Sequence, residues 1–303
     1  MPPGPEFRDR ARSRISHMDA HRPTGLTPAI RQMQGTTSQA LLVALIADYT
    51  VHGRGELPSS AIIHLLGEFG ISAAGARSAL SRVARRGLLT PRKSGRRTYY
   101  SITEADLATR VGRLQTYIDF GPPEQEWDGT WTVIVFTSSE DERGVRARLR
   151  TSLERSGFAP LIDAVWIKPG RQDDAIDIIS AAPEVRQAAM HSQFLSLDGL
   201  DPVKAFDLDG IRGRYEAFIT EFRPLLERFV AGEVGASDAM IARVRVLDAW
   251  RAIALTDPNL PHVLLPTPWP QATARGIFTR LWEASRDLSR MRVAEVIRQH
   301  SPA

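Results

Sequence analysis

The chain contains no cysteine among its 303 residues, which excludes disulfide bonds, thiolate nucleophiles and cysteine-ligated metal sites. It also has no apolar run near the roughly 20 residues that a helix needs to cross a bilayer, and no charged-then-apolar leader. Hydrophobic residues nevertheless reach 43%, enough for two or three domains with their own cores. These features predict a multi-domain cytoplasmic protein with no membrane partner.

Signatures of the common enzyme classes are missing as well. There is no P-loop, no Gly-x-Ser-x-Gly elbow and no His-Glu-x-x-His zinc motif. His17 and His21 have a metal-compatible spacing, but they lie in residues 1–36, a segment rich in Arg, Pro and small polar residues. We predict that this segment is a disordered arm, and that the protein is no enzyme and holds no metal or cofactor.

Acidic residues are missing from one particular stretch. The net charge of +4 is uneven: up to Phe120 there are 17 Lys and Arg against 9 Asp and Glu, which gives +8 and leaves −4 for the remainder. Between Ala74 and Thr98 eight residues are basic and none is acidic. Since a solubilising surface usually mixes both signs, this pattern favours a nucleic-acid binder.

A predicted helix over residues 74–86 separates its residues into two faces. At about 100° per residue, its apolar side chains fall in one arc and its Arg and Ser side chains in the opposite arc. Arginine can donate a bidentate pair to guanine, and serine lets a helix backbone approach the duplex closely. The helix is therefore either a DNA recognition helix or an ordinary amphipathic helix with a solvated face.

The flanking segments favour the first interpretation. Helices are expected from Ser38 to His52 and from Ser59 to Phe69, with a loop through Leu57 and Pro58 between them. Two strands, 88–91 and 98–102, follow, joined by a basic turn over 92–97. The whole predicts a winged helix-turn-helix domain over residues 37–120 that binds double-stranded DNA through Arg77, Ser78, Ser81, Arg82, Arg85, Arg86, Arg92, Lys93, Arg96 and Arg97.

The remainder predicts an α+β chain with two further domains. In residues 121–200, strands at 130–136, 158–162, 164–168 and 190–197 alternate with helices at 141–156 and 173–181, the order of a ferredoxin-like domain. Residues 201–303 are expected to be helical, over 211–230, 236–255 and 269–298. The proline-rich segment between the last two helices is either the floor of a ligand pocket or a simple connector.

Several motifs together resemble one family. They are ARSALSRV (76–83), WDGTW (127–131), GFAPL (157–161), VWIKP (165–169), DPNLP (257–261) and Trp269-Pro270. In this order and spacing they resemble the PaaX family of phenylacetate-catabolism repressors. The resemblance implies a dimeric repressor of operator DNA that an aryl-CoA thioester such as phenylacetyl-CoA releases, with a Cas2-like central domain and a helical C-terminal domain.

The resemblance leaves two questions open. Cas2-like domains can be nucleases that hold a metal through an aspartate after the first strand, but here Thr137, Ser138 and Ser139 occupy that place. An effector needs cations for its phosphates and an apolar slot for its acyl group. The candidates are Arg245, Trp250, Arg251 and Trp269, which could instead be surface ion pairs and core aromatics. A DNA binder without any effector is the alternative function.

Overall fold

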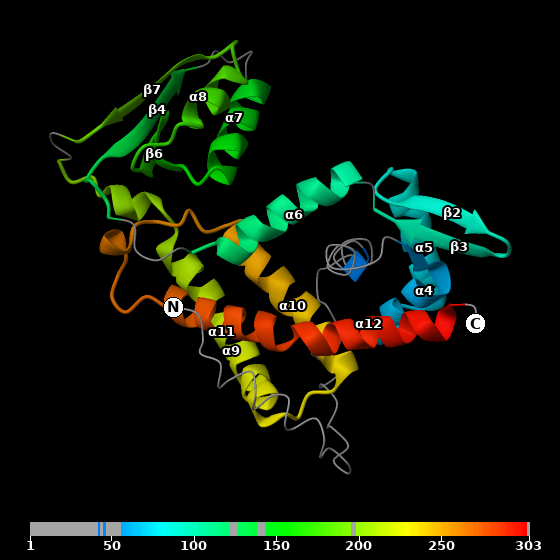
Figure 1. The fold of residues 1–303 in the computed structure, drawn as a ribbon. Helices are drawn as coiled ribbons and strands as arrows, with labels where there is room; N and C mark the ends of the chain where they lie inside the picture. Colours follow the sequence, from blue (N-terminus) through cyan, green and yellow to red (C-terminus); the bar gives the residue numbers. More distant parts are fainter. Residues whose placement is uncertain are drawn as a thin grey trace.

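The computed structural model describes residues 42, 45–46, 56–102, 104–121, 126–137, 143–194 and 198–301. The expected arm over 1–36 and most of the expected helix after Ser38 lie outside these residues. Figure 1 shows a helix-and-hairpin unit at one end of the molecule and a small β-sheet domain at the other, with long helices between them. The α+β class is confirmed.

The N-terminal unit consists of β1 (Leu57–Pro58), α4 (Ser59–Glu68), α5 (Ala73–Arg85), β2 (Thr90–Ser94) and β3 (Arg97–Ser101), followed by α6 (Glu104–Asp119). Ser72 caps α5, since its Oγ accepts a hydrogen bond from the Gly75 amide at 3.1 Å. The strands form one antiparallel sheet in the order β1-β3-β2.

Two details of this unit differ from the sequence prediction. Leu57 and Pro58, expected in a loop, pair with Tyr100 and Tyr99 as an edge strand. The hairpin strands run further toward the turn than predicted, so only Gly95 and Arg96 separate them. The pattern of apolar residues could not indicate this extension, because every residue of β2 is exposed and the strand pairs with β3 through its backbone.

The central domain contains β4 (Trp131–Thr137), α7 (Arg143–Arg155), β5 (Ala159–Ile162), β6 (Val165–Pro169), α8 (Ala175–Ser180) and β7 (Arg186–Ser192). All strand pairs are antiparallel in the order β5-β6-β4-β7, as expected of a ferredoxin-like sheet. The prediction of the last strand at 190–197 was wrong in position, since β7 is a mostly exposed edge strand without the apolar residues that mark a buried one.

The two faces of this sheet have different partners. Ile134, Phe136 and Trp166 pack with α7 and α8 on one face. On the opposite face, Trp131, Val133 and Ile167 pack with residues of the C-terminal part, among them Phe206, Leu260 and Leu265. The proline-rich connector between the long helices thus covers the sheet and joins the two domains.

The C-terminal domain contains α9 (Leu208–Ala231), α10 (Ala236–Ala254), α11 (Gln271–Ala284) and α12 (Arg286–His300), with short 3₁₀ turns at Pro202–Ala205 and His262–Leu264. The single helix predicted for 269–298 is therefore two. They are separated at Ser285, whose hydroxyl donates to the Trp282 carbonyl at 3.3 Å. Trp250 of α10 is fully buried and stacks on Phe278 of α11, with ring centroids 4.9 Å apart.

Candidate functional sites

Helix α5 presents a basic, exposed face. Its buried residues are Ala76, Ala79, Leu80 and Val83, which pack against the core that includes α4. The residues of this helix that are predicted to contact DNA are all exposed: Arg77, Ser78, Ser81, Arg82 and Arg85. Arg86, which directly follows the helix, is exposed as well. The structure therefore separates the two faces as the sequence predicted.

The exposed face of α5 has some internal order. Arg82 donates a hydrogen bond from Nη1 to the Ser78 hydroxyl, one turn earlier, at 2.6 Å. This contact fixes the guanidinium along the helix surface while leaving its other donors free to meet a partner. With Arg85 it also places positive charge in the last turn, where it complements the helix dipole.

The hairpin cations have unequal surroundings. Arg92 of β2 binds both carboxylate oxygens of Glu56, with Nη2 to Oε2 at 2.5 Å, and lies 5.1 Å from the centre of the Tyr99 ring. This contact lowers the pKa of Glu56 through the hydrogen bond. Lys93, Arg96 and Arg97 are exposed, and Arg97 also approaches the His300 carbonyl at 3.4 Å. Arg92 thus binds the residue that precedes β1 and helps to hold the hairpin against that strand.

A polar cluster joins α4 to the C-terminal helices. Glu68 of α4, whose side chain is 11% exposed, binds Arg292 of α12 at 2.8 Å and accepts a hydrogen bond from Ser237 of α10. One turn earlier, His64 Nδ1 lies 3.1 Å from His300 Nε2. We call these five residues the α4–α12 latch. It ties the unit that carries α5 to the C-terminal domain.

The four predicted effector residues do not meet. Trp250 has no exposed surface, and its indole donates to the Tyr117 carbonyl at 3.0 Å. Arg245 pairs with Glu221 and Arg251 with Asp248. Trp269 lies under the Arg212 guanidinium, 5.0 Å from its ring centre. These contacts are those of ion pairs and core aromatics, and none of the four residues lines the pocket described next.

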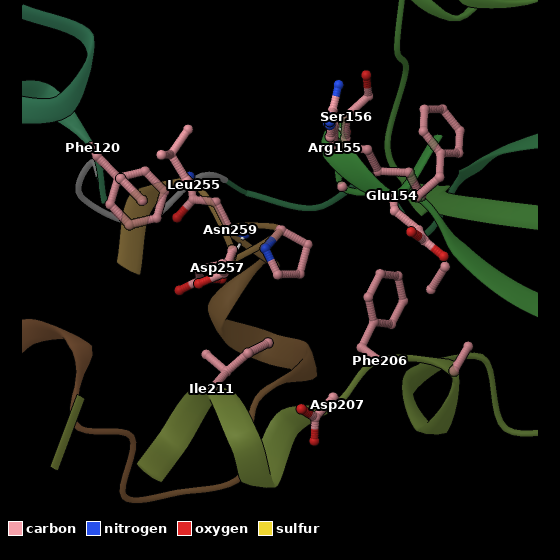
Figure 2. Close-up of a pocket in the computed structure, with 18 of the residues that line it drawn as sticks. Phe120, Glu154, Arg155, Ser156, Phe206, Asp207, Ile211, Leu255, Asp257 and Asn259 are labelled. Carbon is pink, nitrogen blue, oxygen red and sulfur yellow. Dashed lines mark hydrogen bonds between the residues drawn. The ribbon is translucent and has the colours of Figure 1, made fainter. Parts of the chain in front are cut away.

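A pocket of about 670 Å³ lies elsewhere, between the central and C-terminal domains. Figure 2 shows Glu154, Arg155 and Ser156 of the central domain on one side, and Leu255, Asp257 and Asn259 of the C-terminal domain on the other. Its lining comes from residues 154–160, 205–207 and 254–259, together with Phe120, Lys168, Asp174, Ile211 and Arg214. The first half of the proline-rich connector therefore lines a pocket as well as joining two helices.

Burial changes the pKa of two charged groups of this pocket and encloses a donor atom of a third. Asp257 accepts hydrogen bonds from the Tyr215 hydroxyl at 2.5 Å and from the Asn259 amide at 2.8 Å, yet burial raises its pKa. Burial also lowers the pKa of Lys168, whose ammonium donates to the Ser156 carbonyl at 2.8 Å. The Nε of Arg214 is buried and has no hydrogen-bond partner among the residues that the structure describes. Sequence patterns did not single out Arg214, and Lys168 was noted only as part of the VWIKP motif.

Comparison with known proteins follows the same three-part division. Residues 37–106 match the family model of the PaaX-like protein, residues 124–195 that of the PaaX protein central Cas2-like domain, and residues 206–295 that of the PaaX-like protein C-terminal domain. The chain belongs to the PaaX family. The resemblance inferred from the motifs is confirmed, and so is a Cas2-like central domain.

Two relatives of this PaaX family chain extend the comparison. The transcriptional repressor PaaX of Escherichia coli (strain K12) is 25% identical over 259 residues, which is 80% of this chain and 79% of the repressor. A solved structure of an uncharacterized protein from Mycobacterium tuberculosis is 24% identical, with a TM-score of 0.56, and covers 85% of this chain and 99% of that one. The second likeness shows the fold alone. The first agrees with the prediction of a regulator that is not an enzyme.

Two of the motifs that carried the resemblance meet at the pocket. Gly157 of GFAPL has φ +79°, and a Cβ placed on it would lie 3.3 Å from Cα of Pro258, in DPNLP. Only glycine combines this backbone conformation with so close an approach. In this PaaX family chain, the two segments therefore form the contact between the central and C-terminal domains beside the pocket.

No helix in the described ranges combines the length and apolar character that a membrane crossing requires.

Proposed function

We propose that the protein is a DNA-binding transcriptional regulator whose N-terminal unit is a winged helix-turn-helix. One observation carries the proposal: every Arg and Ser predicted to touch DNA lies on the exposed face of α5 or on the hairpin, while the apolar face of α5 is buried. A helix of this kind fits the major groove of B-DNA, and the hairpin cations would meet the phosphate backbone.

The residues divide into two roles. Arg77, Ser78, Ser81, Arg82 and Arg85 are placed to read base edges, with Arg86 at the end of the helix. Lys93, Arg96 and Arg97 of the hairpin, with Arg92 when it leaves Glu56, would neutralise phosphates and fix the register. Operator binding as a homodimer would set two recognition helices about 34 Å apart, or a multiple of that distance.

Relationship to a named transcriptional repressor supports repression as the direction of control. We further propose that a small-molecule effector, an aryl-CoA thioester such as phenylacetyl-CoA, releases the protein from the operator of an aromatic-acid catabolic operon in the cytoplasm. Such release requires that the effector bind the DNA-incompetent conformation more tightly. The competing function is a DNA binder without an effector.

Binding-site selection from random double-stranded DNA with the full chain tests the proposal. We expect one enriched sequence with two related half-sites, and a titration of that duplex with phenylacetyl-CoA should weaken binding. No enrichment over the starting pool would contradict sequence-specific DNA binding. Enrichment with no response to phenylacetyl-CoA or to other aryl-CoA thioesters would favour the effector-independent function.

A further inference from the structure

The pocket between the central and C-terminal domains has unmet capacity to donate hydrogen bonds. Its acidic residues are already engaged: Asp207 accepts from the Gly210 amide at 3.0 Å, and Asp257 from Tyr215 and Asn259. Arg214 is the opposite case, because its buried Nε has no acceptor. A buried donor without a partner is costly, so Arg214 would gain from turning its guanidinium toward an acceptor that a ligand brings into the pocket.

A second cation of the pocket also retains free donors. Lys168 uses one donor for the Ser156 carbonyl, and its ammonium carries two more. Asp174 of the lining acts on Lys168 through the electrostatic field. Arg214 and Lys168 come from different domains, α9 and β6, so one anionic group could connect the two domains.

Apolar surface borders these cations. Phe120, Phe206, Ile211 and Leu255 line the pocket, and Leu255 is 56% exposed although it is a large apolar residue. The volume of about 670 Å³ lies within the roughly 300–1,000 Å³ of small-molecule sites. We propose that this pocket binds an organic anion, with its carboxylate or phosphate on Arg214 and Lys168 and its apolar part against these four residues.

The pocket also touches the helix that leads to the DNA-reading unit. Phe120 directly follows α6, and its ring contacts Trp250 at 6.0 Å between centroids. The end of α6 is held by Trp250 and by Arg275, which approaches the Asp119 carbonyl at 3.5 Å. A ligand against Phe120 would shift α6 and with it the hairpin that precedes it. This regulatory step rests on the proposed DNA-binding function, whereas the binding site does not.

Calorimetric titration of the full chain tests the site with three probes: phenylacetate, its neutral analogue phenylacetamide, and phenylacetyl-CoA. We expect one or both anionic probes to bind and phenylacetamide not to. Arg214→Gln should weaken the binding anion about 10- to 100-fold, because a charge-assisted hydrogen bond is lost. Arg214→Lys, which keeps the charge, should restore part of the affinity. Which anion binds distinguishes a free acid from its CoA thioester.

Two further variants distinguish a loss of ligand binding from a loss of folding. Arg223→Gln replaces an exposed arginine of the same helix outside the pocket and should leave the affinity unchanged. Leu255→Asp adds a carboxylate at an exposed position of the lining, so it should fold and repel the anion. The inference is overturned if no anionic probe binds at millimolar concentration, if phenylacetamide binds equally well, or if Arg214→Gln and Leu255→Asp bind like the wild type.

Control of DNA binding gives a separate readout. If the ligand weakens the binding of selected DNA by a given factor, saturating DNA must weaken ligand binding by the same factor. Arg82→Ala, on α5, should require about 5- to 150-fold more of the selected DNA to produce the same coupling, while ligand binding in the absence of DNA stays normal. Ligand binding without coupling would overturn the regulatory step alone, and failure of the wild type to bind DNA would count against the proposed function instead.

Discussion

The α4–α12 latch predicts how firmly the N-terminal unit is attached to the C-terminal domain. The Glu68 side chain is 11% exposed and the Arg292 side chain 20%, so their ion pair at 2.8 Å is shielded from most solvent. Glu68→Ala removes one charge-assisted hydrogen bond of about 1.5–3 kcal/mol and the bond from Ser237, of about 0.5–1.5 kcal/mol. Arg292 keeps Glu295 as a partner, which offsets part of the loss. We expect a net cost of about 2–3 kcal/mol.

Hydrogen–deuterium exchange of the α4 amides measures this cost locally. Opening of α4 from α12 should become about 30- to 150-fold more frequent in Glu68→Ala, the equivalent of 2–3 kcal/mol. Glu295→Ala is the control. Glu295 also pairs with Arg292, but its side chain is 46% exposed and it lies three residues away on the same helix, so its loss should cost no more than about 0.5 kcal/mol.

Arg292→Ala combined with Glu68→Ala forms a double-mutant cycle. Glu68→Ala and Arg292→Ala together should cost less than the sum of the two single changes, with a coupling of about 1–2 kcal/mol. Unchanged protection of α4 in Glu68→Ala, or equal loss in Glu295→Ala, would refute the view that Glu68 holds the two units together.

Three other predictions concern the core, the domain contact and the hairpin. Trp250→Phe should destabilise the C-terminal domain by about 2–4 kcal/mol in urea unfolding, because the Tyr117 carbonyl loses the indole donor, keeping only the Phe120 amide, and a gap opens beside Phe278; a cost below 1 kcal/mol would contradict this. Gly157→Ala should cost about 1–3 kcal/mol and more than Gly170→Ala, which also has positive φ but nothing within 4 Å of its added Cβ; equal costs would contradict the close approach. Because the folded-state pKa of Glu56 lies below its ordinary value of 4.5, its support for the hairpin should be present above that pH and lost as pH falls through the folded pKa, as hairpin amide exchange would show; Glu56→Gln should abolish this pH dependence.

The sequence predicted α4, α5 and the hairpin because the signals for these elements are local. The separation of apolar and basic residues onto two faces of α5 is a property of one helix. Gly70 marks where the preceding turn begins, and Ser72 marks where it ends. The edge strands were not predicted by the same reasoning. Leu57–Pro58 and most of β7 are held by backbone pairing with a neighbour, which leaves little trace in side-chain pattern.

The sequence offered the proline-rich connector as a pocket floor, but the residues opposite it could not be predicted, because the pocket depends on contacts between distant segments. Arg214, Lys168 and Phe120 belong to three different parts of the chain; Lys168 lies in the VWIKP motif, and the other two do not stand out in their segments. The aromatic and basic residues that did stand out, Trp250 and Arg251, lie in the core and in a surface ion pair. The motifs GFAPL and DPNLP were the available signal, since both form the domain contact beside the pocket.

Specific reading of DNA by α5 is the central claim, and a comparison of Arg82→Ala with Arg96→Ala tests it most directly. Fluorescence anisotropy would follow each variant on the selected duplex and on a scrambled one over a range of salt. Arg150→Ala, an exposed arginine of α7, serves as the matched control and should bind both duplexes like the wild type.

Arg82→Ala should lose about 1–3 kcal/mol on the selected duplex and little on the scrambled one, because a base contact is removed. Arg96→Ala should weaken both duplexes alike and reduce the salt slope by about one, since it removes a phosphate contact. The same loss on both duplexes for Arg82→Ala and for Arg96→Ala would contradict the assignment of α5 as the reading element.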